Sequence, residues 1–149
     1  MATLAEMMTR PPARARIVAE CVTMIDEEVA DKSGLTGLAL KGAYSVVKAV
    51  KPRFIGEVVD ALLDEWVGLL EPLYAEWQNG DRKQPLAEYL SSRQGAVAEK
   101  LLGVTDTRVQ SAKNANVKKL YEKLRPTAKK HVEMAVPRLA RLIARHAAT

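Results

Sequence analysis

Cysteine, aromatic residues and long apolar runs are all scarce in this chain. Its 149 residues include one cysteine, Cys21, which excludes the internal disulfide framework of a small secreted domain. Cys21 falls on the apolar face of its helix, so we expect a buried thiol and not a reactive nucleophile. No stretch approaches the roughly 18 uncharged apolar residues of a transmembrane helix, and the N-terminus lacks the apolar segment of a secretory signal. These absences predict a cytoplasmic protein without a transmembrane segment.

The alternating apolar and polar pattern of β-strands is also missing. Apolar residues make up 48% of the chain, charged residues 28% and aromatic residues only 5%, which is the balance of a globular domain with an aliphatic core. The apolar residues recur with the period of a helix. The sequence therefore predicts an all-α fold, with a single helical domain over residues 1–149. We expect an irregular bundle of about six to seven helices with proline-marked boundaries and kinks.

Caps and prolines mark the first two helices. Thr3 followed by Glu6 has the spacing of a capping box and predicts a short first helix. Pro11 and Pro12 suit the first turn of a longer helix, which the apolar spacing extends over residues 11–31.

The next helix is predicted over residues 34–51. Gly34 closes the preceding helix in a left-handed conformation, and either Asp31 or Ser33 caps the new one. Apolar residues cover more than half of the circumference of this helix. We therefore expect it to lie at the centre of the bundle, where neighbouring helices cover most of its surface.

The clearest amphipathic helix is predicted to start at Pro52 and to end at Asn79. Pro72 lies inside its pattern and predicts a kink, as Pro137 does in the last helix of the chain. The apolar residues of the amphipathic helix share one face: Ile55, Val58, Val59, Leu62, Trp66, Leu69, Leu70, Leu73 and Trp77.

Acidic residues occupy the opposite side of this amphipathic helix, and residues 54–81 hold seven acidic residues and no basic one. The candidate acidic partner face consists of Glu57, Asp60, Asp64 and Glu71. A solvated acidic face is the plain interpretation, and a basic partner is the functional one. A metal site is not expected, because no histidine lies at the Glu-x-x-His spacing of helical metal sites.

Four positions mark the helices in the second half of the chain. Pro85 opens a short helix, and a further helical stretch stops near Gly103. Thr105 caps a helix over residues 106–124, and Pro126 begins the last helix. The residues expected to bury the helix over 106–124 are Val109, Ala112, Leu120, Tyr121 and Leu124.

Positive charge is concentrated near the C-terminus. Residues 1–106 hold 12 basic and 16 acidic residues, whereas residues 107–149 hold 11 basic and 2 acidic ones. Clustered cations attract phosphate backbones and anionic surfaces. The acidic residues of 54–81 are an alternative set of partners, which would neutralise these cations within the fold. The candidate surface for an anion, a nucleic acid or another partner consists of Lys118, Lys119, Lys129, Lys130, Arg138, Arg141 and Arg145.

Two other patterns have a chemical interpretation. Lys32, Ser33 and Gly34 faintly resemble a phosphate-binding loop, but the upstream glycine and the preceding strand of that motif are missing. A modest anion site at the start of the helix over 34–51 is the interpretation that remains. The histidines are His131 and His146, and neither has a serine or cysteine beside it at local spacing.

The sequence therefore favours a non-enzymatic helical binding protein that recognises its partner through charged helix faces. Nucleic-acid binding through the basic C-terminal helices is the first alternative. Binding to a lipid or membrane surface, with Trp66 and Trp77 exposed by opening of the helices, is the second. An enzyme assembled from distant helices is the third. No cofactor or metal is expected, and a protein partner or self-association stays open.

Two segments carry a resemblance to a known family. The first contains Asp31-Lys32-Ser33-Gly34-Leu35-Thr36-Gly37, and the second runs from Val104 to Pro137 and includes Leu120-Tyr121-Glu122-Lys123-Leu124-Arg125. Together they resemble a family of small, uncharacterised bacterial all-helical proteins with a basic C-terminal region. The resemblance covers about half of the chain and leaves out residues 54–103. It implies a helical fold and no particular activity.

Overall fold

The computed structural model describes residues 3–80, 84–111, 113 and 115–147, except for the side chains of residues 117 and 120. Over these residues the protein is all-α, with seven helices and no strand, as predicted. The helices are α1 (Leu4–Met8), α2 (Ala13–Ala30), α3 (Gly34–Val50), α4 (Phe54–Asn79), α5 (Leu86–Ser91), α6 (Gln94–Gln110) and α7 (Ala115–His146).

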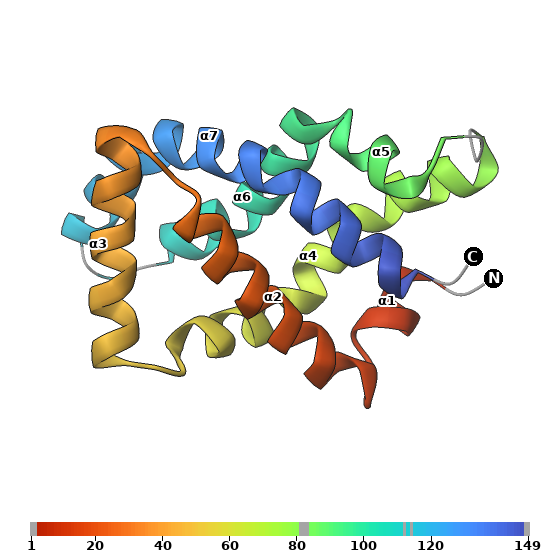
Figure 1. Ribbon diagram of the computed structural model, residues 1–149, viewed down its shortest axis with the longest axis horizontal. Coiled ribbons are helices and arrows are strands. Elements are labelled where there is room, and N and C mark those ends of the chain that lie inside the picture. Colours follow the sequence, from red (N-terminus) through yellow and green to blue (C-terminus); the bar gives the residue numbers. More distant parts are fainter. Residues whose placement is uncertain (1–2, 81–83, 112, 114, 148–149) are drawn as a thin grey trace.

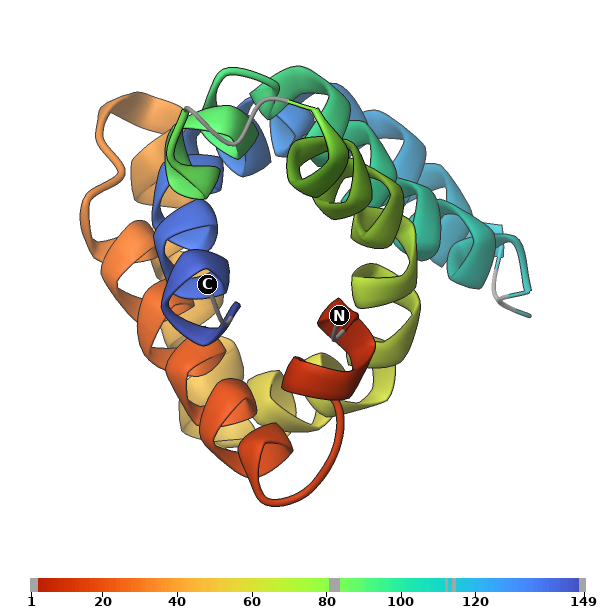
Figure 2. The ribbon, with the colours of Figure 1, turned by 90° about the vertical axis from the view of Figure 1, so that its right-hand side faces the viewer.

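The helices form a ring rather than a solid parallel bundle. The long helices α4 and α7 lie on opposite sides of the ring, and α2 runs across between their ends (Figures 1 and 2). Helices α5 and α6 pack against α7, and α1 packs against α4 and α2. Helix α3 stands across one end of the molecule, where it contacts α2 and α4 (Figure 1). Side chains directed into this ring form the core.

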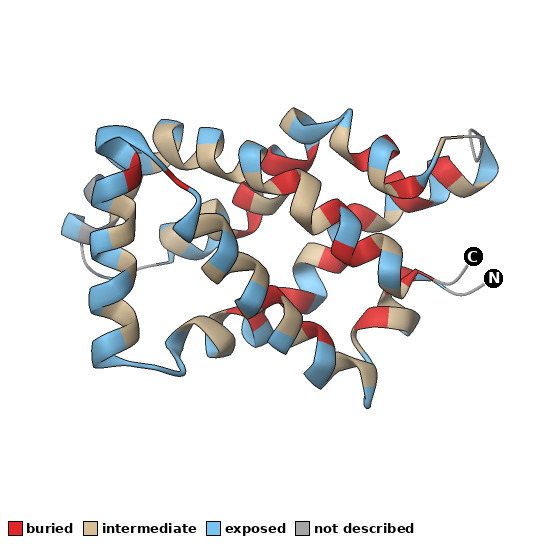
Figure 3. Ribbon diagram, in the orientation of Figure 1, coloured by how far each residue is buried: buried red, intermediate tan, exposed pale blue. Residues whose placement is uncertain are grey.

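The core is aliphatic, as the composition predicts. Buried positions are concentrated on α4, α5 and the second half of α7 (Figure 3). The predicted face of α4 is largely confirmed, because Val59, Leu62 and Trp77 are all buried. Leu69 is an exception: it lies at the edge of that face and is 38% exposed. The largest fully buried side chains are Tyr74, Leu4, Ile17, Leu142, Val97 and Val136.

The capping box at the N-terminus of α1 is confirmed. The hydroxyl of Thr3 accepts a hydrogen bond from the Glu6 amide at 3.1 Å. The carboxylate of Glu71 supplies two further acceptors, for the amides of Leu4 at 3.0 Å and Ala5 at 3.1 Å. Since the first amides of a helix have no partner within the helix, Glu71 joins the start of α1 to the middle of α4.

The predicted helix boundaries at Gly103, Thr105 and Pro126 are wrong. Helix α6 continues through Gly103 to Gln110, and α7 passes through Pro126 and Pro137. The Thr105 hydroxyl donates to the Leu102 carbonyl at 2.9 Å, which is a bond within the helix and not an N-terminal cap. Packing of α7 along α5 and α6 outweighs the hydrogen bonds that its two prolines remove. Ala112 and the side chain of Leu120, both expected in the core, lie outside the described residues.

The predicted central position of α3 is also wrong. Gly34 has the expected left-handed backbone, with φ at +75°, but it begins α3 and does not end α2, whose C-cap residue is Asp31. Ser33 is the N-cap residue of α3, although its side chain makes no capping hydrogen bond. Gly37 is the only residue of α3 that is buried. The helix is apolar around most of its circumference, yet it lies at the periphery of the molecule (Figure 3).

Candidate functional site

Part of the predicted basic surface is paired within the fold, at Lys129, Arg138 and Arg145. Arg138 of α7 donates to Glu28 at 2.9 Å and also binds Asp31. Arg145 donates to Glu20 at 2.9 Å. These ion pairs join α7 to α2. Arg138 and Arg145 are therefore engaged within the fold and are less available to an external partner.

Helix α6 supplies a second set of acidic partners. Lys129 lies 3.0 Å from Glu99, and Arg125 pairs with Glu99 and Asp106. Among the described residues, the pair between Arg108 and Glu65 is the only one that joins the acidic stretch 54–81 to the basic C-terminal region. Neutralisation of the basic region therefore comes mainly from α2 and α6 and not from α4.

Among the described residues of α7, five cations lie outside this network, and four of them are exposed. Lys119, Lys123, Lys130 and Arg141 are exposed and form no ion pair within the described part of the chain. At 100° per residue they fall within about 40° of arc on α7, along a line of about 33 Å. Lys118 is partly buried beside them. We call these four exposed residues the cationic strip.

The predicted acidic face is similarly engaged. Arg14 of α2 donates to Asp60 at 2.8 Å and to Asp64 at 3.0 Å, and Glu71 holds the start of α1. Glu57 is exposed, and no ion pair joins it to another described residue. Three of the four carboxylates therefore serve contacts between α1, α2 and α4.

Lys32, one of the residues predicted for an anion site, is buried and only 4% exposed. Its ammonium donates to Glu28 at 2.8 Å and to the backbone carbonyl of His131 at 3.2 Å. Ser33 and Gly34 are exposed beside it. The lysine thus binds a carboxylate of its own chain.

The two histidines lack the surroundings of a catalytic pair. His131 has a buried Nδ1 without a hydrogen-bond partner, and burial lowers its pKa. The Nε2 atom of His146 lies 2.9 Å from the Oε2 atom of Glu20. Cys21 is buried, and desolvation raises the pKa of its thiol to about 11, which disfavours the reactive thiolate. No group of three or more His, Cys, Asp or Glu side chains in the described residues is placed to hold a metal ion.

The structure reveals a cavity that the sequence analysis missed. It has a volume of about 290 Å³ and lies inside the ring of helices. Helices α1, α2, α4, α6 and α7 contribute its lining: Leu4, Met8, Cys21, Met24, Ile25, Val59, Leu63, Trp66, Val67, Leu70, Leu101, Leu102, Thr105, Val132, Ala135, Val136, Leu139, Leu142 and Ile143. Each of these looks like an ordinary core residue in sequence, so no local pattern could have revealed the space between them.

The few polar groups in the cavity wall are already hydrogen-bonded. The indole of Trp66 donates to the Leu101 carbonyl at 3.1 Å. The Thr105 hydroxyl is bonded to the Leu102 carbonyl and lies 2.8 Å from the Tyr121 hydroxyl. A molecule inside the cavity would therefore meet hydrocarbon surface on almost every side.

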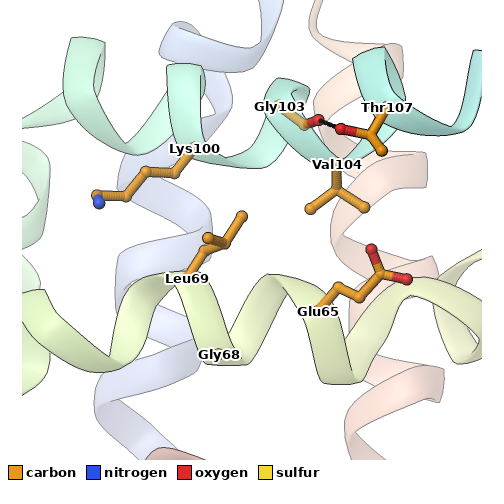
Figure 4. Close-up of a pocket in the computed structure, with 7 residues that line it drawn as sticks. All are labelled: Glu65, Gly68, Leu69, Lys100, Gly103, Val104 and Thr107. Carbon is orange, nitrogen blue, oxygen red and sulfur yellow. Dashed lines mark hydrogen bonds between the residues drawn. The ribbon is translucent and has the colours of Figure 1, made fainter. Parts of the chain in front are cut away.

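A second hollow, of about 610 Å³, lies on the outside of the molecule between α4 and α6. Figure 4 shows Lys100 and Glu65 at opposite ends of this groove, with Leu69 and Val104 between them. Glu65 is paired with Arg108. The groove offers a short apolar floor without a convergent set of polar groups, so the less open cavity between the five helices is the better candidate for a binding site.

Comparisons with known proteins give a family but no activity. Neither a curated protein nor a solved structure matches the chain. No helix among the described residues is long and apolar enough to cross a membrane. One family model matches residues 4–147. The match includes residues 54–103, which the sequence resemblance had left out. The chain therefore belongs to this family, a family of unknown function designated DUF6918.

Proposed function

We propose that this protein binds a small apolar molecule, with a hydrocarbon chain or ring system as its main body, in the cavity between α1, α2, α4, α6 and α7. The observation that carries the proposal is the size of this apolar cavity, about 290 Å³. Protein interiors are close-packed and hold few voids larger than a water molecule. The volume approaches the roughly 300–1,000 Å³ of small-molecule sites.

Energetics support an occupied cavity. The cavity is partly open to solvent, but its lining is almost wholly apolar, so water that enters it finds few hydrogen-bond partners. Water does not fill such a space well, because apolar cavities of about 150 Å³ stay dry and take up benzene instead. A bound apolar molecule restores the missing contacts.

The lining also restricts the chemistry of the ligand. Because the Trp66 and Thr105 donors are used inside the wall, a polar ligand would lose its hydrogen bonds to water without replacement. The preferred ligand is therefore uncharged over the part that enters the cavity. Selection among such ligands rests on shape.

The test is a titration with N-phenyl-1-naphthylamine, an uncharged dye that fluoresces in apolar sites. We expect saturable binding to the wild-type protein. Ala135 lines the cavity, so Ala135→Leu should fill part of it and weaken dye binding at least tenfold, while raising the unfolding temperature of the ligand-free protein. Ala96→Leu, at an exposed position of α6, is the matched control. Absence of saturable binding, or equal loss in both variants, would contradict the proposal.

A second candidate function is binding of a polyanion such as a nucleic acid. The cationic strip supports it, because Lys119, Lys123, Lys130 and Arg141 form a single line of exposed positive charge. Fluorescence anisotropy of labelled duplex DNA at low and physiological salt tests this function. Lys130→Glu with Arg141→Glu should abolish a salt-sensitive signal. Lys41→Glu with Lys51→Glu makes the same change in net charge, on α3 and at its C-cap residue, and should leave the signal intact.

A further inference from the structure

Helix α3 presents a broad apolar face to solvent. Leu35 is 88% exposed, Leu38 63%, Val46 62% and Val50 72%. At 100° per residue these four side chains fall within about 120° of arc. The exposed residues between them are small and uncharged: Ala39, Gly42 and Ala49. We call this surface the α3 apolar face. Single exposed apolar residues are common, but a contiguous apolar patch marks a binding surface.

The orientation of α3 is set by its polar side. The Tyr44 hydroxyl donates to the Asp26 carboxylate of α2, and Lys48 donates to the same carboxylate at 2.9 Å. Gly37 approaches the backbone of Lys32 so closely that an added Cβ would lie 2.9 Å from its carbonyl carbon. An ordinary surface helix buries its apolar face and exposes its polar face. Helix α3 does the reverse, and these contacts hold it that way.

The segment that carries this face has positive charge only. No acidic residue occurs from Lys32 to Gly56. Lys41, Lys51 and Arg53 form no ion pair among the described residues, and Lys51 and Arg53 are exposed at the C-terminal end of α3. Phe54, 39% exposed, follows directly. An apolar helix face with cations and an aromatic ring at its edge is typical of helices that lie in the surface of a membrane.

We propose that α3 docks this protein on anionic lipid bilayers, with the α3 apolar face inserted at the level of the headgroups and Lys51 and Arg53 against lipid phosphates. No described helix can span a bilayer, so the contact is with one surface only. Helix α3 stands across one end of the molecule (Figure 1), so its whole length can lie on a flat bilayer surface. Two copies paired through this face would each bring the unpaired cations Lys41, Lys51 and Arg53 to the interface, which favours a negatively charged partner. The proposal stands on α3 alone and does not depend on a ligand in the cavity.

The experiment is co-sedimentation with vesicles of phosphatidylcholine alone, or of phosphatidylcholine and phosphatidylglycerol in equal parts. We expect binding to the anionic vesicles and much weaker binding to the neutral ones. Leu38→Glu with Val46→Glu should reduce binding at least tenfold with helicity unchanged, because both positions are exposed. Leu124→Glu with Met134→Glu is the matched control, since these α7 residues are 52% and 60% exposed and lie outside α3. This control variant should lose at most a few-fold in binding to anionic vesicles, because only its net charge changes.

A third variant separates charge from apolar insertion. Lys51→Glu with Arg53→Glu should remove the preference for anionic over neutral vesicles. Lack of binding to either vesicle would overturn the proposal, and so would equal losses in the α3 variant and its control. The wild-type protein could instead form a dimer and fail to bind vesicles. If Leu38→Glu with Val46→Glu then dissociates that dimer, the face would be assigned to a second copy of the chain. Ala135→Leu should leave vesicle binding unchanged, so failure of ligand binding is distinguishable from failure of docking.

Discussion

Lys32 is the one buried charged side chain among the described residues, and it depends on Glu28. Removing one partner of a buried ion pair leaves the other desolvated and unpaired. We predict that Glu28→Ala lowers the free energy of unfolding by about 3–5 kcal/mol. Lys32→Met should cost less, because Glu28 keeps Arg138 as a partner. Urea denaturation of both variants measures the difference, and equal costs would show that the pair itself is not what matters.

Cys21 lines the cavity, so the reactivity of its thiol reports on access to the cavity. Burial raises the pKa of its thiol from 9.0 to about 11. At pH 8 the thiolate fraction is then about a hundredfold lower than in the unfolded chain. We predict that Cys21 reacts with Ellman's reagent at least a hundredfold more slowly in the native protein than in urea. An apolar ligand should slow the native reaction further, and a native rate close to the denatured rate would contradict the burial.

At the scale of elements, alanine substitutions at two glycines of α3 should have opposite effects on stability. An alanine Cβ at Gly37 would lie 2.9 Å from backbone of Lys32, whereas one at Gly42 meets nothing within 4 Å. Gly37→Ala should therefore destabilise the protein by about 1–3 kcal/mol through overpacking. Gly42→Ala should stabilise α3 by about 1 kcal/mol, because alanine is the better helix former. Thermal unfolding of the two variants tests this pair, and a loss of stability in both would contradict the open space at Gly42.

The sequence predicted which segments are helical better than where the later helices end. The Thr3 capping box and the apolar face of α4 depend on local spacing, and both are found. The prediction that Pro126 begins a helix is wrong because a proline at a helix start and a proline inside a helix look alike in sequence. Packing of α7 on α5 and α6 decides between them, and those contacts are made by residues far apart in the chain.

The face of α3 and the cavity were beyond prediction for a related reason. Apolar composition says that α3 prefers burial, but the Tyr44 and Lys48 bonds to Asp26 decide which side faces the molecule. The cavity is a property of the volume left between five helices. Its wall residues, such as Leu63 and Val136, have the same helical spacing that they would have in a filled core.

At the scale of the whole molecule, ion pairs hold α2 and α6 to α7 around the cavity. Glu20, Glu28 and Asp31 of α2 face Arg138 and Arg145 of α7. On the other side, Glu99 and Asp106 of α6 face Arg125. Five cations of the basic C-terminal region thus help to hold the ring together: Arg108, Arg125, Lys129, Arg138 and Arg145. Loss of charge on their acidic partners at low pH should lower the stability of the fold.

We predict that the free energy of unfolding falls in two steps as the pH decreases. The first involves His131, whose pKa lies below the ordinary 6.5, chiefly because of burial and also because of Lys32. Below about pH 6.5 the unfolded chain binds a proton that the native protein resists, so stability decreases until the native pKa is passed. The second step involves carboxylates whose pKa values are lowered by hydrogen bonds, among them Asp26, through Tyr44 first, and Asp106, through Arg125.

These carboxylates give stability that is complete above their unfolded pKa values, 3.8 for aspartate, and that is lost as the pH falls through their lower native values. Urea denaturation between about pH 7.5 and pH 3 measures both steps. His131→Asn should remove the first step and keep the second, because asparagine does not titrate. Arg125→Gln should weaken the second step and keep the first. A single decline, unchanged by either variant, would mean that neither the buried histidine nor the link between α6 and α7 controls the acid stability of the fold.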